Sequence, residues 1–131
     1  MKSLSGMDKR TVAELLEYIL QSIDLIQKRT DGITKSDDFL KDDRGLEKLD
    51  AVSMRLQSIG EAIKSIHKQN KAVLIAAADE EYWSGIVRLR EIISHHYIDI
   101  DSEIIFDVCQ NELDELKQVI KQCLAASLTK P

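Results

Sequence analysis

The sequence has very few residues that end or reverse a polypeptide chain. Its 131 residues include one proline, at the last position, and five glycines. Proline breaks helices and glycine favours turns, so this chain can form long helices, and a sandwich of many short strands is disfavoured. The length suits one domain over residues 1–131, large enough to bury a core without disulfides or metals.

Long hydrophobic runs are also missing. The longest lies around residues 73–78, too short to cross a membrane, and the first six residues lack the apolar core of a signal peptide. The two cysteines, Cys109 and Cys123, lie 14 positions apart in what reads as one helix. They would be roughly 21 Å apart, beyond disulfide reach. We therefore expect a cytoplasmic protein with no disulfide.

An excess of positive charge is absent as well. The net charge is −5, and residues 98–116 carry seven acids without a lysine or arginine. A protein that coats nucleic acid through bulk electrostatics is therefore disfavoured, and any RNA must bind at a local site. The acids serve either as a solvated helix face, their usual role, or as a surface for a protein partner.

Apolar residues at helical spacing predict five helices. We expect them over residues 8–29, from Ser36 as N-cap through Leu40, and over 44–68, 79–94 and 101–125. The predicted fold is an all-α, up-and-down bundle, with an apolar face that could form a homodimer. The apolar stripe of the last helix is Ile105, Cys109, Leu113, Leu116, Ile120 and Cys123.

Three polar or small positions on the third predicted helix also carry expectations. Gly60 interrupts the apolar stripe and costs about 1 kcal/mol relative to alanine, which indicates the close approach of another helix. Glu61 is expected to form an ion pair that holds the bundle or the dimer together. His67, at the edge of the stripe, reads as a structural histidine.

Arg90 breaks the pattern of the fourth predicted helix. Isoleucine and valine residues flank it at helical spacing, so it lies on or beside the apolar stripe. A charge there is costly unless it is paired or solvated in a cleft. Arg88, by contrast, reads as an exposed residue paired with Glu91.

Histidines follow at the end of this helix, where His95 and His96 precede Tyr97. A histidine can exchange protons near neutral pH, and an arginine can bind a phosphate through two parallel hydrogen bonds. Together they supply two needs of metal-free RNA cleavage: a proton carrier, and a positive charge for the phosphorane-like transition state. The ordinary alternative is that helix-end histidines act as caps.

The spacing leaves the geometry of such a site open. On a continuous helix Arg90 and His95 would point about 140° apart, whereas Arg88 and His95 would share a face. Either the helix ends before His95 or a second subunit completes the site. The residues alone thus predict a helical bundle with an anomalous arginine and a helix-end histidine.

The segment Arg90-Glu-Ile-Ile-Ser-His95-His-Tyr97 resembles the motif of the HepT-type toxins, a family of HEPN ribonucleases. Their motif is arginine, four residues, histidine, any residue and tyrosine. The resemblance extends to Trp83, to residues 97–101 and to the segment Met54-Arg-Leu-Gln-Ser-Ile-Gly-Glu-Ala62. It covers nearly the whole chain in length and in the order of the helices.

The resemblance implies a HEPN-like homodimer in which both Arg–His motifs face one cleft. It implies a metal-independent endoribonuclease that cleaves single-stranded RNA, either tRNA or mRNA, without a cofactor. Arg90 and His95 would be catalytic. The chain would be the toxin of a type VII-like toxin–antitoxin pair, neutralised when a minimal nucleotidyltransferase antitoxin transfers AMP to Tyr97.

Two departures from the family pattern keep alternatives open. Glu91 stands where the family often has asparagine, and it could pair with Arg90 or Arg88 and weaken phosphate binding. His96 creates the looser pairs Arg88–His95 and Arg90–His96, although only Arg90 with His95 keeps the tyrosine spacing. The alternative function is a non-catalytic helical module that binds the nucleotidyltransferase. No spacing of the zinc kind is present, so no metal is expected.

Overall fold

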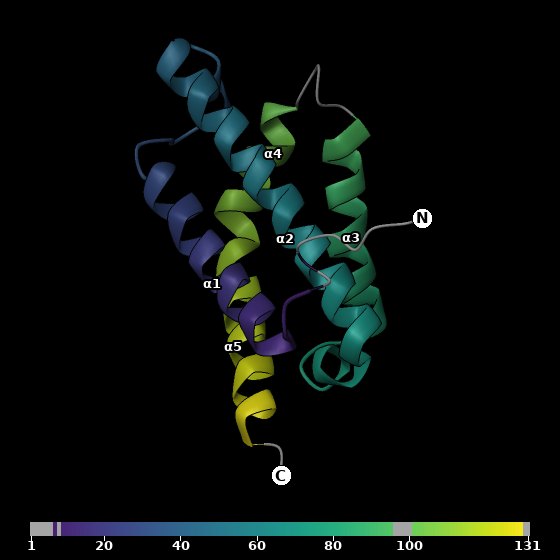
Figure 1. Cartoon of the computed structure of the whole chain (residues 1–131). Helices are drawn as coiled ribbons and strands as arrows, with labels where there is room; N and C mark the ends of the chain where they lie inside the picture. The colour runs from purple at the N-terminus through teal and green to yellow at the C-terminus, as the bar shows by residue number, and fades with distance from the viewer. Residues whose placement is uncertain (1–6, 8, 96–100, 130–131) are drawn as a thin grey trace.

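The computed structural model describes residues 7, 9–95 and 101–129. Within them lie α1 (Val12–Arg29), the 3₁₀ helix η1 (Ser36–Phe39), α2 (Asp43–Ile75), α3 (Glu80–His95), α4 (Ser102–Asn111) and α5 (Leu113–Thr129). No strand occurs in this part of the chain, which confirms the all-α prediction. Figure 1 shows α2 crossing the molecule, with α1 on one side and α3 on the other.

Polar side chains define where several helices begin. Thr11 and Glu14 form a capping box at α1, in which each side chain accepts the other residue's backbone N–H at 3.1 and 2.9 Å. The side chains of Asp42 and Asp101 cap α2 and α4 by accepting backbone N–H groups of the first turn, without a reciprocal bond. The predicted cap at Ser36 is wrong, because Ser36 is already helical and the N-cap position, Lys35, makes no side-chain cap.

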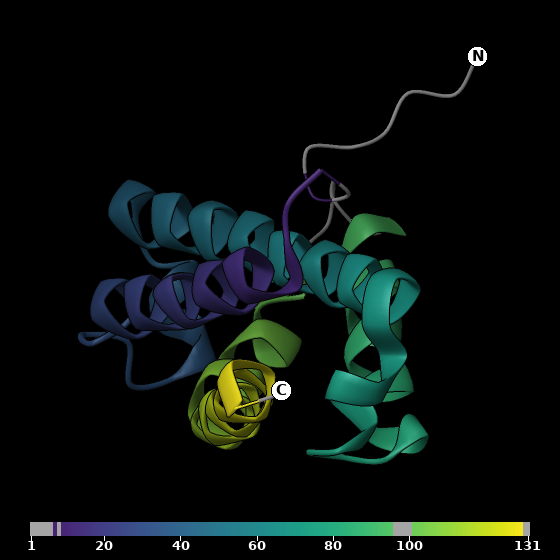
Figure 2. The ribbon, with the colours of Figure 1, turned by 60° about the horizontal axis from the view of Figure 1, so that its bottom comes forward.

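The helix α2 extends well beyond the predicted end at residue 68. Its backbone leaves helical geometry at Asn70, with φ −160° and ψ 79°, and then resumes to Ile75. Figure 2 shows this last part of α2 bending away from the main axis. The bend buries Val73 and Leu74, and the Leu74 carbonyl accepts a 2.9 Å hydrogen bond from Trp83 Nε1. Tertiary burial therefore continues a helix whose regular apolar stripe has ended.

The predicted last helix is two helices. The chain leaves helical geometry at Glu112, with φ −121° and ψ −25°, between α4 and α5. Val108 is buried in the position that the stripe assigned to Cys109, and Leu113 resumes the buried row in α5. In an uninterrupted helix of about 3.6 residues per turn, the predicted residues 105, 109 and 113 would gradually rotate away from the core. The interruption at Glu112 changes the helical phase, so that Leu113 again faces the core.

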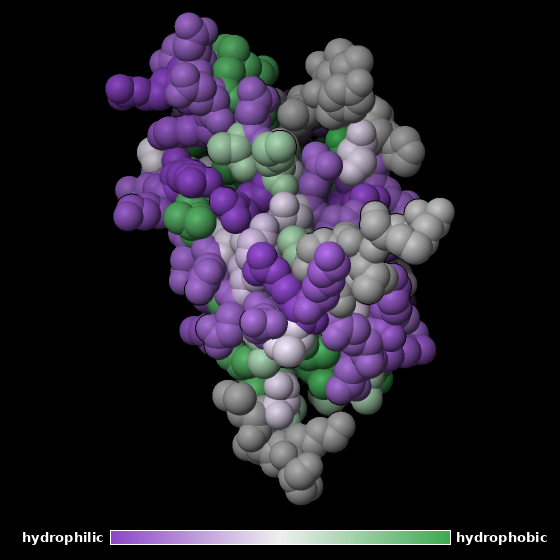
Figure 3. Space-filling model, in the orientation of Figure 1, coloured by the Kyte–Doolittle hydropathy of each residue, from purple (hydrophilic) through white to green (hydrophobic). Residues whose placement is uncertain are grey.

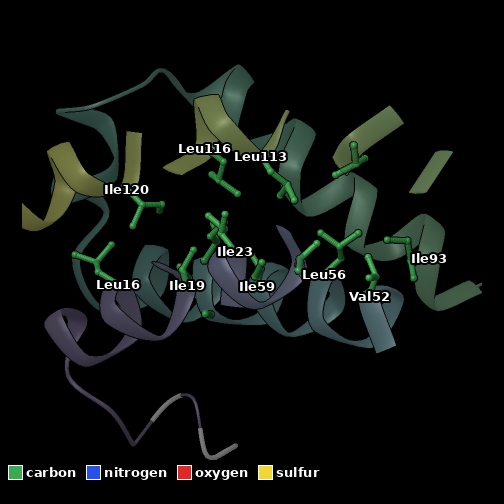
Figure 4. Packing of buried hydrophobic residues seen from close by; sticks show 14 of the residues in the cluster. Leu16, Ile19, Ile23, Val52, Leu56, Ile59, Ile93, Leu113, Leu116 and Ile120 are labelled. Carbon is green, nitrogen blue, oxygen red and sulfur yellow. The ribbon is translucent and has the colours of Figure 1, made fainter. Parts of the chain in front are cut away.

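The core lies where α1, α2 and α5 meet. Figure 4 shows isoleucine and leucine side chains of these helices pointing toward one another, among them Ile19, Ile59 and Ile120, each at most 1% exposed. The α4 helix contributes Ile105 and Val108. In contrast, α3 makes its main contacts with α2. It is this outer helix that carries Arg90 and His95.

The surface formed by α1, α2 and α3 is mostly hydrophilic, with scattered apolar side chains (Figure 3). Among the described residues no helix combines the length and the apolarity needed to cross a membrane.

Candidate functional site

The candidate site lies along the contact between α2 and α3, which run antiparallel side by side (Figure 1). Gln57 of α2 accepts a 3.1 Å hydrogen bond from Ser94 Oγ of α3. One turn further along α2, Gly60 and Glu61 contact Arg90. Each successive turn of α2 thus contacts the preceding turn of α3, as expected for antiparallel helices.

Gly60 makes room for the stem of Arg90. A Cβ atom placed on Gly60 would lie 2.6 Å from Arg90 Cγ and closer still to Arg90 Cβ. Real side chains do not approach so closely, and Arg90 Cβ is fixed to the α3 backbone, so any larger residue would push the helices apart. The predicted close approach at Gly60 is confirmed, and the approaching group is the anomalous arginine itself.

Glu61 holds the charged end of Arg90. Its Oε1 forms an ion pair with Arg90 Nη2, and the side chains are 40% and 25% exposed. Arg90 Nε is buried and has no hydrogen-bond partner among the described residues. This pairing confirms the expectation that Glu61 contributes an ion pair to the bundle. It also explains how a charge is accommodated beside the apolar stripe.

His95 is the last residue of α3, and the structure describes its backbone. The alternative that the helix ends before His95 is therefore wrong. Because the helix is continuous, positions 90 and 95 of the backbone are separated by about 140° around its axis. His96 and Tyr97, the second histidine and the predicted AMP acceptor, lie outside the described residues.

A groove of about 410 Å³ lies beside the Arg90–Glu61 pair, also between α2 and α3. It has an apolar floor and charged walls. Its lining residues are Ile63, Lys64, His67, Glu80, Trp83, Ser84, Val87, Arg88 and Glu91.

The charged wall of this groove is partly organised by Glu80. Its carboxylate contacts Lys71 Nζ at 2.6 Å and His67 Nε2 at 3.3 Å. The hydrogen bond from Lys71 is the largest influence on the pKa of Glu80 and, with the bond from His67, lowers it below its usual value. His67 is exposed and faces the groove, and its contact with Glu80 joins α2 to α3, in agreement with the satisfied structural histidine that the sequence predicted.

The supporting residues predicted from the sequence take different places. Arg88 and Glu91 are both exposed and line the groove, and no ion pair joins them in the part of the chain that the structure describes. The carboxylate that the structure pairs with Arg90 is Glu61. Sequence reasoning missed the groove residue Lys64, because one lysine on a helix surface gives no signal until the opposite helix is placed.

A family model for ribonucleases of the HepT-like family matches residues 19–123, a range that includes Arg90, His95 and the whole helix pair. The chain belongs to this HepT-like ribonuclease family. The resemblance seen in the motif is thus confirmed by a match over most of the chain. Ribonuclease is the activity of the family, and RNA is its class of substrate.

Individual relatives carry names of the same kind. A protein of Methanocaldococcus jannaschii, named as a candidate RNase, is 34% identical over 88% of this chain and 92% of its own length. A candidate RNase of Caldanaerobacter subterraneus is 29% identical over 88% and 96%. A candidate ribonuclease HepT of Thermococcus cleftensis is 30% identical over 83% and 92%. No solved structure is significantly similar to the chain.

Proposed function

We propose that this chain, as one HEPN-like domain over residues 1–131, is the toxin of a type VII-like toxin–antitoxin pair in the cytoplasm. It cleaves single-stranded RNA without a metal. The observation that carries this proposal is the placement of Arg90, held over Gly60 by Glu61 on the helix that ends at His95, in a chain of a ribonuclease family.

Arg90 and His95 have separate roles in the proposed reaction. The 2′-oxygen of one ribose loses its proton to a base and bonds to the adjacent phosphorus, while the bond from phosphorus to the leaving 5′-oxygen breaks and that oxygen gains a proton. His95 carries one of these protons, and Arg90 stabilises the negative charge that gathers on the phosphoryl oxygens. The step needs no metal, oxidant or further reactant.

Two copies of the chain would complete the site. One histidine serves as acid or base but not both in a single step, and Arg90 and His95 diverge around the helix axis, so a second copy supplies the missing partner. Exposed apolar side chains near this end of the helix pair support such a contact: Met54 of α2 is 71% exposed and Ile92 of α3 is 38% exposed.

Regulation by AMP transfer is the second part of the proposal. A nucleotidyltransferase antitoxin would attach AMP to Tyr97, two positions after His95, and the added phosphate would repel RNA by like charge. Intact mass should rise in AMP units after incubation with the partner and ATP, and Tyr97→Phe should abolish the rise. An unchanged mass of the wild-type chain would reject this part.

The non-catalytic module remains the second candidate, and one contact favours it. Arg90 already has a carboxylate partner in Glu61, which lowers its attraction for a phosphate. In that case the free protein would bind the nucleotidyltransferase and cleave no RNA.

RNA cleavage by the purified protein in EDTA separates these functions. We expect wild type to cut single-stranded RNA, and we expect both Arg90→Ala and His95→Ala to lose activity while they remain folded at the assay temperature. Arg29→Ala, which removes an exposed arginine from the last turn of α1, is the matched control. Equal cleavage by wild type and His95→Ala would reject His95, and no cleavage by any variant across tRNA and mRNA would favour the module.

A further inference from the structure

We propose that the groove between α2 and α3 binds one nucleotide of the single-stranded RNA, beside the bond that is cut. This inference rests on the proposed function and adds a substrate-binding subsite to it. The residues that define this subsite are Lys64, Arg88 and Ser84, over the floor formed by Ile63, Trp83 and Val87.

The size and floor of the groove fit a nucleotide. Small-molecule sites usually enclose about 300–1,000 Å³, and 410 Å³ lies at the small end of that range. Trp83 is 2% exposed, and its indole Nε1 donates to the carbonyls of Leu74 and Ala78 at 2.9 and 3.1 Å. Ile63 and Trp83 thus form a rigid apolar layer, above which the half-buried Val87 presents the apolar surface that a base can contact.

The walls provide the polar contacts that a nucleotide requires. Lys64 comes from α2 and Arg88 from α3, and neither forms an ion pair within the described ranges. Two cations from opposite walls suit one phosphate, and the Glu80 carboxylate in the same groove is already paired with Lys71 and His67. Ser84 can donate to or accept from a base edge.

The groove is continuous with the proposed catalytic end of α3. Ser84, Arg88 and Glu91 follow one another at helical spacing along one face, and position 95 is the next on that face, four residues or about 6 Å of helical rise beyond Glu91. An RNA strand that lies along this face would therefore reach the His95 position directly from the groove.

Binding of a labelled single-stranded RNA with a 2′-deoxy residue at the cut site tests the subsite separately from cleavage. We expect Lys64→Ala combined with Arg88→Ala to weaken binding by at least about tenfold, because the variant loses both charge-assisted contacts to the phosphate. The slope of log affinity against log salt should fall by about 0.7 for each phosphate that the variant no longer neutralises. Lys28→Ala combined with Lys121→Ala removes the same charge from exposed positions on α1 and α5 and is the control.

A second variant fills the groove without changing its charge. Ser84 is exposed, so Ser84→Phe should fold with an unchanged melting temperature while it blocks access to the floor. It should raise KM for single-stranded RNA by blocking the place of the nucleotide beside the cut bond, and Ser84→Ala, which removes only the hydroxyl, should raise KM much less. A free nucleotide could occupy the same groove. AMP binding is therefore measured on the groove double variant and on Ser84→Phe.

The outcomes distinguish the subsite from the proposed activity. Equal affinity of the groove double variant and the control double variant, with Ser84→Phe binding RNA as wild type does, would overturn the subsite even if wild type cleaves RNA. Saturable AMP binding that only Ser84→Phe abolishes, with RNA binding unaffected, would also overturn it by assigning the groove to a free nucleotide. Groove-dependent RNA binding without cleavage would support the subsite and reject the nuclease.

Discussion

Gly60→Ala should destabilise the protein although alanine is the better helix former. In a helix interior, alanine is favoured over glycine by about 1 kcal/mol. At Gly60, however, the new Cβ would lie 2.6 Å from Arg90 Cγ, and overpacking of this kind costs about 1–3 kcal/mol. The two effects together predict a net loss of roughly 0–2 kcal/mol in the free energy of unfolding.

Gly85→Ala is a matched control in the adjacent helix. Gly85 is exposed within α3, and a Cβ there would meet nothing within 4 Å. The same substitution should therefore stabilise the protein by up to about 1 kcal/mol. Because the gain in helix propensity is common to both variants, the difference between them isolates the contact with Arg90, about 1–3 kcal/mol.

Urea unfolding followed by circular dichroism measures this difference, and RNA cleavage provides an independent reading. Displacement of Arg90 should reduce the cleavage rate of Gly60→Ala while Gly85→Ala keeps it. If Gly60→Ala stabilised the protein as much as Gly85→Ala, Arg90 could not lie over Gly60 as described, and the reasoning about the site would fail.

Three further predictions concern the surroundings of the site. Glu61→Gln should lower kcat because Arg90 loses its positioning partner, and should lower KM because a competing carboxylate is gone. Its cost in stability is about 1 kcal/mol, since the pair is partly exposed. A rise in kcat would contradict this. Burial first, and then nearby acids, raise the pKa of Glu112, so the folded state disfavours its charged form. Glu112→Gln should therefore be more stable than wild type at pH 7, and this advantage should disappear below about pH 4, where Glu112 is protonated in both the folded and the unfolded state. Urea unfolding at both pH values measures the difference in stability. An equal advantage at the two pH values would refute the prediction. Trp83→Phe should lower the free energy of unfolding by about 1–3 kcal/mol, because the Leu74 and Ala78 carbonyls lose their indole donor. Unfolding is followed by circular dichroism, since the variant has no tryptophan. An unchanged unfolding midpoint would contradict the role of these hydrogen bonds.

Much of the fold could be predicted from apolar spacing. The predicted helices over 8–29 and 79–94 correspond closely to α1 and α3. The predictions failed where long-range burial outweighs local pattern. Beyond Asn70, α2 continues because its last turns pack against Trp83. At Glu112 the helix is interrupted, and Leu113 is again buried in the core.

The Arg–His motif of the candidate site was predictable from the sequence, but the residues of α2 that contact Arg90 were not. Arg90 was identifiable because a charge on an apolar stripe is anomalous, and the relation of Gly60 to a close helix followed from the cost of a mid-helix glycine. That Gly60 and Arg90 face each other could not be inferred, because residues 30 positions apart carry no mutual signal in one sequence.

The sequence by itself determined that the chain is helical, which helix faces are apolar and where the Arg–His motif lies, because helix formation depends on neighbours three and four positions apart. Only the tertiary structure decided that Glu61 is the partner of Arg90 and that Lys64 and Arg88 share one groove. Those relations depend on how α2 and α3 align, and that alignment is set by the packing of ridges and grooves along their whole contact.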